Sequence, residues 1–259
     1  MPIVLDATTG SHLGDRAEQQ DRIAIIPSRI APGTVLAVLA DGAGGYTGGA
    51  AAAQQVIATA TSLFERFTPK TDAVEQLLAD IVEEAHTVIK LNRVLTEEEP
   101  HSTFVALVLQ PDRADWAHVG DSRLYHFREA ALQWRTPDHS IAEQMIREGK
   151  LTEATRRTFR NRNILLQALG GADTPMPTLG GTRPLRPGDT FLLCSDGLWD
   201  YFTDAELGQA LAALPPRKTA EMLIGAARVR SKGRGDNVSV IIIKLTEAPA
   251  KLTAEPAKA

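Results

Sequence analysis

Residues 35–45 read Val-Leu-Ala-Val-Leu-Ala-Asp-Gly-Ala-Gly-Gly. The run begins with consecutive apolar residues, which is typical of a strand buried on both faces, because a half-exposed strand would alternate apolar and polar side chains. We therefore predict a core strand over Val35–Leu39. The run ends at Asp41-Gly42, a pair that either closes a turn or places a carboxylate at the end of that strand.

The same kind of apolar run recurs along the chain and predicts further strands. The clear runs are Phe104–Leu109, Phe191–Cys194 and Val238–Ile243, and the more mixed ones are Arg22–Ile26 and Trp116–Val119. Helical patterns cover Gly48–Phe67, Asp72–Leu95, Asp204–Leu214 and Arg217–Val229. Strands joined by short connections favour antiparallel sheets with amphipathic helices packed on their outer faces. The patterns thus predict a layered α+β domain.

Composition limits the classes of protein that this chain can belong to. The 259 residues carry a formal net charge of −4, which does not suggest binding to nucleic acid or to a membrane surface. Cys194 is the only cysteine, so an intrachain disulfide and a cysteine-rich zinc site are excluded. We see no secretory signal and no apolar stretch long enough to span a bilayer, and we expect a cytoplasmic monomer.

Four aspartates fall beside the predicted core strands. Asp41, Asp121 and Asp196 each follow an apolar run closely, and Asp236 lies two residues before another. Each could close an ordinary turn, since Asp-Gly and Gly-Asp pairs are common there. If the strand ends converge, however, the carboxylates would repel one another unless a hard divalent cation such as magnesium or manganese lay between them.

At this point six short motifs resemble those of the type 2C metal-dependent protein serine/threonine phosphatases, in their bacterial single-domain form. They are Arg16 with Gln19-Gln20-Asp21, Asp41-Gly42-Ala43-Gly44-Gly45, Gly120-Asp121-Ser122-Arg123, Asp138-His139-Ser140, Ser195-Asp196-Gly197-Leu198 and Asp236-Asn237. Each motif is weak alone, but the six stand in the family's order and spacing. The resemblance implies an α+β fold, a four-layer α-β-β-α sandwich of two antiparallel sheets flanked by helix pairs. It implies a catalytic domain over residues 1–247 with a flap at about 138–181, followed by a disordered tail over 248–259.

The resemblance also implies roles for the acidic residues. Asp41 would bridge two Mn²⁺ or Mg²⁺ ions, the carbonyl of Gly42 would bind one of them, and Asp196 and Asp236 would complete the shell. Asp121 would hold a third ion. A water between the first two ions would hydrolyse phosphoserine or phosphothreonine directly.

The remaining implied residues lie around this centre. Arg16 would grip the substrate phosphate, because a guanidinium offers a planar fork of donors. Asp21 and Gln20 would act through waters or from behind the ligands, and Asn237 would steady them. We interpret Cys194 as a core residue and not as a nucleophile, since it lies inside an apolar run.

The chain departs from the family pattern at several positions. Gln19 stands where asparagine is common, and Gln20 stands where many members have glutamate. Ala43 occupies a position where some members carry a histidine proposed as general acid. His101-Ser102-Thr103 replaces the usual Gly-Thr-Thr. The leaving-group proton must then come from a water at the ions or from no dedicated group.

Three functional hypotheses follow from this pattern. The first is a signalling phosphatase that acts on phosphorylated proteins and opposes a serine/threonine kinase. The second is a non-catalytic phosphoprotein-binding regulatory module with the same fold. The third is a phosphatase for small phosphoesters or for a stress-signalling partner switch. The predicted flap carries four arginines, Arg156, Arg157, Arg160 and Arg162. They would form either a basic surface that attracts acidic substrates or an ordinary solvated helix face, and we favour the solvated face.

Overall fold

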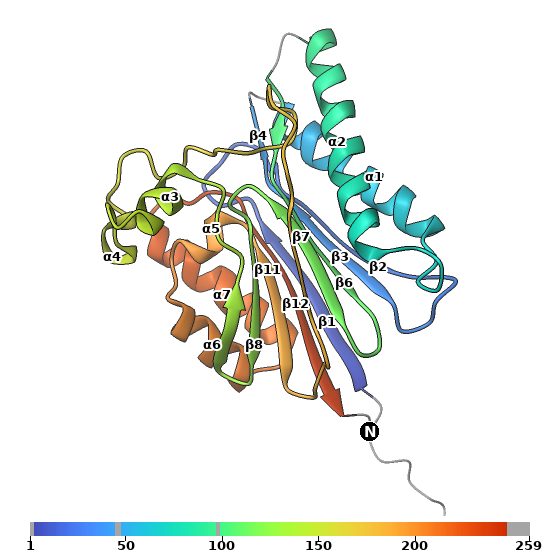
Figure 1. Ribbon diagram of the computed structural model, residues 1–259. Coiled ribbons are helices and arrows are strands. Elements are labelled where there is room, and N and C mark those ends of the chain that lie inside the picture. Colours follow the sequence, from blue (N-terminus) through green and yellow to red (C-terminus); the bar gives the residue numbers. More distant parts are fainter. Residues whose placement is uncertain (1–2, 45–47, 97–98, 248–259) are drawn as a thin grey trace, which may run out of the picture.

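Two stacked antiparallel sheets form the centre of the protein (Figure 1). The computed structural model describes residues 3–44, 48–96 and 99–247. The first sheet has the order β1 (Ile3–His12), β12 (Val238–Glu247), β11 (Asp189–Cys194), β8 (Arg123–Arg128) and β9 (Ala131–Arg135). The second has the order β10 (Thr178–Thr182), β7 (Ala114–Val119), β6 (Phe104–Leu109), β3 (Val35–Ala40) and β2 (Arg22–Pro27). A separate short pair joins β4 (Gly42–Ala43) to β5 (His101–Ser102).

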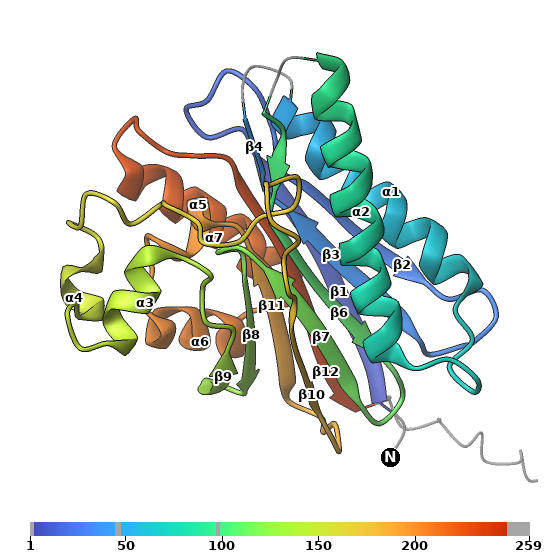
Figure 2. The same cartoon turned by 45° about the horizontal axis from the view of Figure 1, so that its top comes forward.

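Helix pairs cover the outer faces of the sheets, as Figure 2 shows. Helices α1 (Gly48–Arg66) and α2 (Val74–Thr96) pack on the second sheet, and α6 (Asp204–Ala213) and α7 (Pro216–Ser231) pack on the first. Short helices α3 (Ile141–Arg147) and α4 (Glu153–Arg156) lie to one side of the sheets, and α5 (Asp196–Trp199) follows β11 directly. The predicted four-layer α-β-β-α sandwich is confirmed.

The burial of β3 explains why its sequence does not alternate. Leu36 and Val38 point toward α1 and α2, whereas Ala37 and Leu39 point toward the other sheet. All four are fully buried. Because both faces of a central strand in this sandwich meet an apolar layer, apolar runs mark the strands that lie in the middle.

The predicted strands and helices are all present, with ends that differ by a few residues. The sequence patterns missed the strands β1, β4, β5, β8, β9 and β10 and the short helices α3, α4 and α5. Strand β8 carries Arg123, His126 and Arg128, which read as polar, yet the first two are buried within ion pairs or hydrogen bonds to acidic partners. Strand β1 alternates half-buried and exposed residues at a sheet edge.

Two further sequence predictions concern the C-terminal tail and membrane-spanning segments. The predicted disordered tail over 248–259 lies outside the described residues. Within the described part of the chain, no helix combines the length and the apolar character that crossing a membrane requires.

Candidate active site at the rim of the two sheets

The topology brings the four predicted aspartates to one rim of the sandwich. Strands β3 and β7 both pair antiparallel with β6 and therefore run in the same direction. Asp41 follows the end of β3 directly, and Asp121 lies two residues beyond the end of β7. In the other sheet Asp196 follows β11, and Asp236 precedes β12, which runs antiparallel to β11. The strand ends converge as the sequence predicted.

A cavity of about 500 Å³ opens at this rim. Its lining includes most of the predicted site residues, namely Arg16, Gln20, Asp41, Gly42, Asp121, Asp196, Asp236 and Asn237. Asp21 is the exception, because it is buried and does not line the cavity. The cavity walls also include Asn163, Leu165 and Ala168, which lie in the segment predicted to be a flap.

The carboxylates in the cavity carry the electrostatic signature of a cation site. Burial, followed by repulsion from Asp21 and Asp196, raises the pKa of Asp41 well above its usual range. Burial, followed by repulsion from Asp121 and Asp236, does the same to the pKa of Asp196. Burial raises the pKa of Asp121 to about 6. Such a cluster is relieved by a bound cation, and its all-oxygen donors suit magnesium or manganese.

Asp21 lies beneath this cluster. Its Oδ2 accepts a hydrogen bond of 2.9 Å from the Ser195 hydroxyl, whereas its buried Oδ1 has no partner. Burial is the main reason that the pKa of Asp21 is raised to about 6. Ser195 in turn accepts from the Ser239 amide at 3.0 Å, so one hydroxyl ties Asp21 to β12. The unpartnered oxygen fits the expectation that Asp21 serves the ions through a water.

Arg16 and Asp236 form an ion pair on the cavity wall. The distance from Arg16 Nη2 to Asp236 Oδ2 is 2.5 Å, and 61% of the Arg16 side chain is exposed. Within residues 3–44, 48–96 and 99–247, no three acidic, histidine or cysteine side chains converge on one point as a ready-made metal site.

Asn237 fastens the Arg16 loop to β12. Its Oδ1 accepts a 2.7 Å hydrogen bond from the Gln20 amide, and its Nδ2 donates to the carbonyls of Leu13 and Glu18 at 2.8 and 3.0 Å. The loop that carries Arg16 is thus held by one amide side chain, whereas the roles of Gln20 and Asn237 at the ions stay predictions.

Glycine at position 42 is required by packing. A Cβ added to Gly42 would lie 2.0 Å from the Gly49 carbonyl oxygen at the start of α1. The backbone of β4 at this position can therefore approach the start of α1 only because residue 42 has no side chain. The resemblance assigned only the Gly42 carbonyl to an ion, and the structure adds a steric reason for glycine at this position.

The flap arginines do not form one solvated face. Arg156 is buried and pairs with Asp138 and Glu143, whereas Arg157 and Arg160 are exposed. Arg162 pairs with Asp200 at 2.5 Å. The favoured interpretation of an ordinary solvated face is therefore wrong for Arg156, because a buried carboxylate pair draws it inward.

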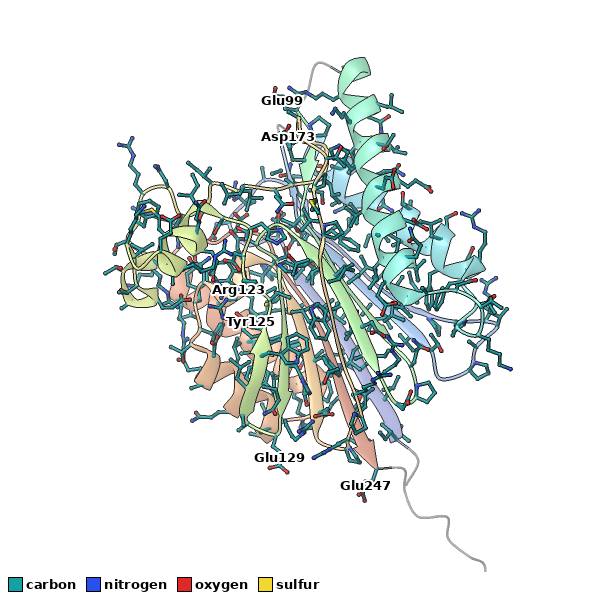
Figure 3. All side chains as sticks on the ribbon, in the orientation of Figure 1. Glu99, Arg123, Tyr125, Glu129, Asp173 and Glu247 are labelled. Atoms are coloured by element: carbon teal, nitrogen blue, oxygen red, sulfur yellow. The ribbon has the colours of Figure 1, made fainter. Side chains whose placement is uncertain are left out.

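Sequence reasoning missed a buried network that links the flap to the Asp121 loop. Arg123 on β8 donates to Asp138 at 2.7 Å and stacks 3.5 Å above the Trp199 ring, and Figure 3 shows it beside Tyr125, to which it also donates. Trp199 donates from Nε1 to the Asp121 carbonyl at 2.9 Å. Arg123 and Asp138 stand in the motifs quoted from the sequence, but only the fold joins them to each other and to Trp199.

A second missed group holds the Asp41 backbone. The Thr103 hydroxyl accepts from the Asp41 amide at 2.9 Å and lies 2.7 Å from the Ser122 hydroxyl. Thr103 thus connects the loop of Asp41 to the motif that contains Asp121. Cys194 is fully buried, and burial raises the pKa of its thiol, which agrees with the core role predicted for it.

Comparison with known proteins identifies the family. The model of the protein phosphatase 2C family matches residues 9–222, and the chain therefore belongs to this family. The serine/threonine protein phosphatase PstP of Mycobacterium tuberculosis is 33% identical over 220 residues, which are 83% of this chain and 41% of that protein. The chain thus spans less than half the length of this curated relative.

Solved structures share the fold. The serine/threonine phosphatase of S. agalactiae has a TM-score of 0.86 and 25% identity, with 94% of this chain and all of that chain covered. The catalytic domain of PstP, solved in complex with two manganese ions, has a TM-score of 0.80 and 28% identity, with 95% and 100% covered.

Proposed function

We propose that the chain hydrolyses phosphoserine and phosphothreonine in proteins with the help of two or three Mn²⁺ or Mg²⁺ ions. The observation that carries this proposal is the convergence of Asp41, Asp121, Asp196 and Asp236 on one cavity that also contains Arg16. The names of the relatives as serine/threonine phosphatases support it. A regulatory module without catalysis would not need to keep all of these carboxylates.

The acids would hold the ions at the floor of the cavity. Two ions would be held by Asp41, Asp196, Asp236 and the carbonyl of Gly42. A third ion would be held in part by Asp121. Ions bound there would supply Lewis acidity beside the phosphoryl oxygens and would make water acidic enough to attack at neutral pH. The mutual repulsion of the acids favours this binding, because each cation removes it.

Arg16 would bind the phosphate at the wall of the cavity. Its exposed guanidinium already lies 2.5 Å from a carboxylate oxygen of Asp236, so it can reach an anion at this edge. A phosphate offers the same oxygen geometry with more charge. Asn163, Leu165 and Ala168 from the proposed flap also line the cavity and would contact the residues that flank the phosphorylated one.

The domain organisation, cellular location and signalling role that we propose depend on this activity. We infer a catalytic domain over residues 1–247 with a flap at about 138–181, which acts as a monomer in the cytoplasm on proteins phosphorylated by a serine/threonine kinase. The supporting observation is that the bacterial relatives with this fold, such as the S. agalactiae enzyme, carry serine/threonine phosphatase names. The role would be in phosphorylation signalling.

The deciding experiment measures phosphate release from a phosphothreonine peptide with and without manganese. We expect release by the wild type to require manganese, and Asp196→Asn to lower it by at least about 100-fold, since it removes a ligand. Asp6→Asn is the matched control, because Asp6 is an exposed acid on β1 outside the cavity. A folded wild-type protein that binds manganese and peptide but releases no phosphate would refute the proposal and favour the regulatory module.

A further inference from the structure

The short β4–β5 pair brings two departures from the family pattern together. Ala43 on β4 lies directly opposite His101 on β5, and both line the active-site cavity. Residues that face each other across an antiparallel pair project from the same side, with Cβ atoms about 4.5–5.5 Å apart. The small side chain of Ala43 therefore leaves the space beside it to the His101 imidazole.

Hydrogen bonding fixes the orientation of this imidazole. His101 Nδ1 lies 2.7 Å from the backbone carbonyl oxygen of Glu99. A carbonyl can only accept, so Nδ1 must carry the hydrogen, and Nε2 is the nitrogen left for the cavity. Figure 3 places Glu99 at the end of the molecule where β4 lies.

The position of His101 suits a group that serves the departing alcohol. His101 is half-buried and lines the cavity, as Asp41 and Asp196 do. The leaving oxygen belongs to a substrate protein, which must stay outside the cavity. A proton donor for that oxygen therefore has to be partly exposed in the cavity lining, and His101 meets this requirement.

The chemistry of the cavity leaves few other donors. The remaining ionisable residues of its lining are the acids Glu18, Asp41, Asp121, Asp196 and Asp236, together with Arg16. Carboxylates that hold cations must be ionised, and a guanidinium does not give up its proton in proteins. Imidazole exchanges protons near neutral pH, which makes it the usual general acid. Among the described residues of the lining, Glu18 is the competing side chain, and a water at the ions is the other possible donor.

We propose that His101 is the general acid of this phosphatase, an inference that rests on the function proposed above. Water forms the new bond to phosphorus as the bond from phosphorus to the serine or threonine oxygen breaks. The electron pair of the broken bond goes to that oxygen, which takes the proton from Nε2 of the imidazolium. His101 is left neutral and regains a proton from solvent before the next turnover.

The test compares two leaving groups in the presence of manganese. Threonine alkoxide is a strong base that needs a proton to leave, whereas p-nitrophenolate is a weak base that does not. We expect His101→Asn and His101→Ala to lower kcat on a phosphothreonine peptide by about 10²–10⁴-fold and to leave hydrolysis of p-nitrophenyl phosphate unchanged. Asparagine can still donate to the Glu99 carbonyl, so its variant separates proton donation from anchoring.

Several outcomes would overturn the assignment. A parallel loss on both substrates would show a structural role, and no loss on either would show no role. The same selective loss in Glu18→Gln, with His101→Asn unaffected, would move the acid to Glu18. A wild type without manganese-dependent release would refute the proposed function itself, which separates that failure from a failure of His101.

A second readout does not depend on turnover. Nitrogen NMR of the imidazole in the metal-free protein should show the His101 tautomer with hydrogen on Nδ1, because the Glu99 carbonyl accepts from it. A tautomer with hydrogen on Nε2 would show that the anchor is wrong and would refute the orientation on which the proposal depends.

Discussion

Replacing Asp121 by asparagine should stabilise the metal-free protein, and the gain should grow with pH. Burial raises the pKa of Asp121 from 3.8 to about 6 in the folded protein. A carboxyl with a raised folded pKa holds its proton more tightly in the native state than in the unfolded chain. The stability of the wild type therefore falls as pH rises from about 4, and the loss is complete above about 6.

The magnitude follows from the two pKa values. The difference between 3.8 and about 6 corresponds to about 3 kcal/mol of lost stability once both states are ionised. Near pH 5 about half of this penalty applies. Asparagine does not ionise, so Asp121→Asn should exceed the wild type by up to about 3 kcal/mol near pH 8. For a domain of this size that gain raises Tm by about 6–10 °C.

Thermal unfolding followed by circular dichroism, with a chelator present, measures the effect at several pH values. Saturating manganese should reverse the order, because cation binding stabilises the ionised wild-type site. The exposed Asp6→Asn should show neither trend. The reasoning fails if the chelated variant is no more stable than the wild type near pH 8, or if its advantage stays constant as the pH falls.

Two further substitutions test the packing around the site, each with a matched control in the same melts. Gly42→Ala should destabilise the fold by about 1–3 kcal/mol, because its Cβ would lie 2.0 Å from the Gly49 carbonyl oxygen. Gly225→Ala meets nothing within 4 Å and should be neutral or stabilising, so equal losses would contradict the steric argument. Arg156→Met should cost about 3–5 kcal/mol, since it leaves the buried Glu143 carboxylate unpaired and leaves Asp138 with Arg123 alone. The exposed Arg157→Met should change stability by no more than about 0.5 kcal/mol, and a similar loss in both would show that the buried ion pairs do not anchor the flap.

The central strands and the outer helices could be predicted from local patterns. Strand β3 is apolar throughout because each of its faces packs against a separate core. Edge strand β1 and the polar strand β8 could not be found this way. The side chains of β8 are buried because their charges are paired by residues distant in sequence, such as Asp138 and Asp189.

The acids of the site were foreseeable because each stands at the end of a recognisable strand or in a family motif. The position of Asp21 beneath the cavity and the inward turn of Arg156 were not. Both depend on partners from other parts of the chain, Ser195 for Asp21 and Asp138 for Arg156. Local pattern carries no information about such pairings.

The sequence by itself determined the layered fold, the rim of carboxylates and the family, because strand burial and motif order are local properties. Only the tertiary structure decided that His101 faces Ala43. Two residues 58 positions apart in the chain become cross-strand neighbours when β4 pairs with β5. Strand pairing is set by the packing of the whole sandwich, and so the residue that we propose as the proton donor became visible only in the fold.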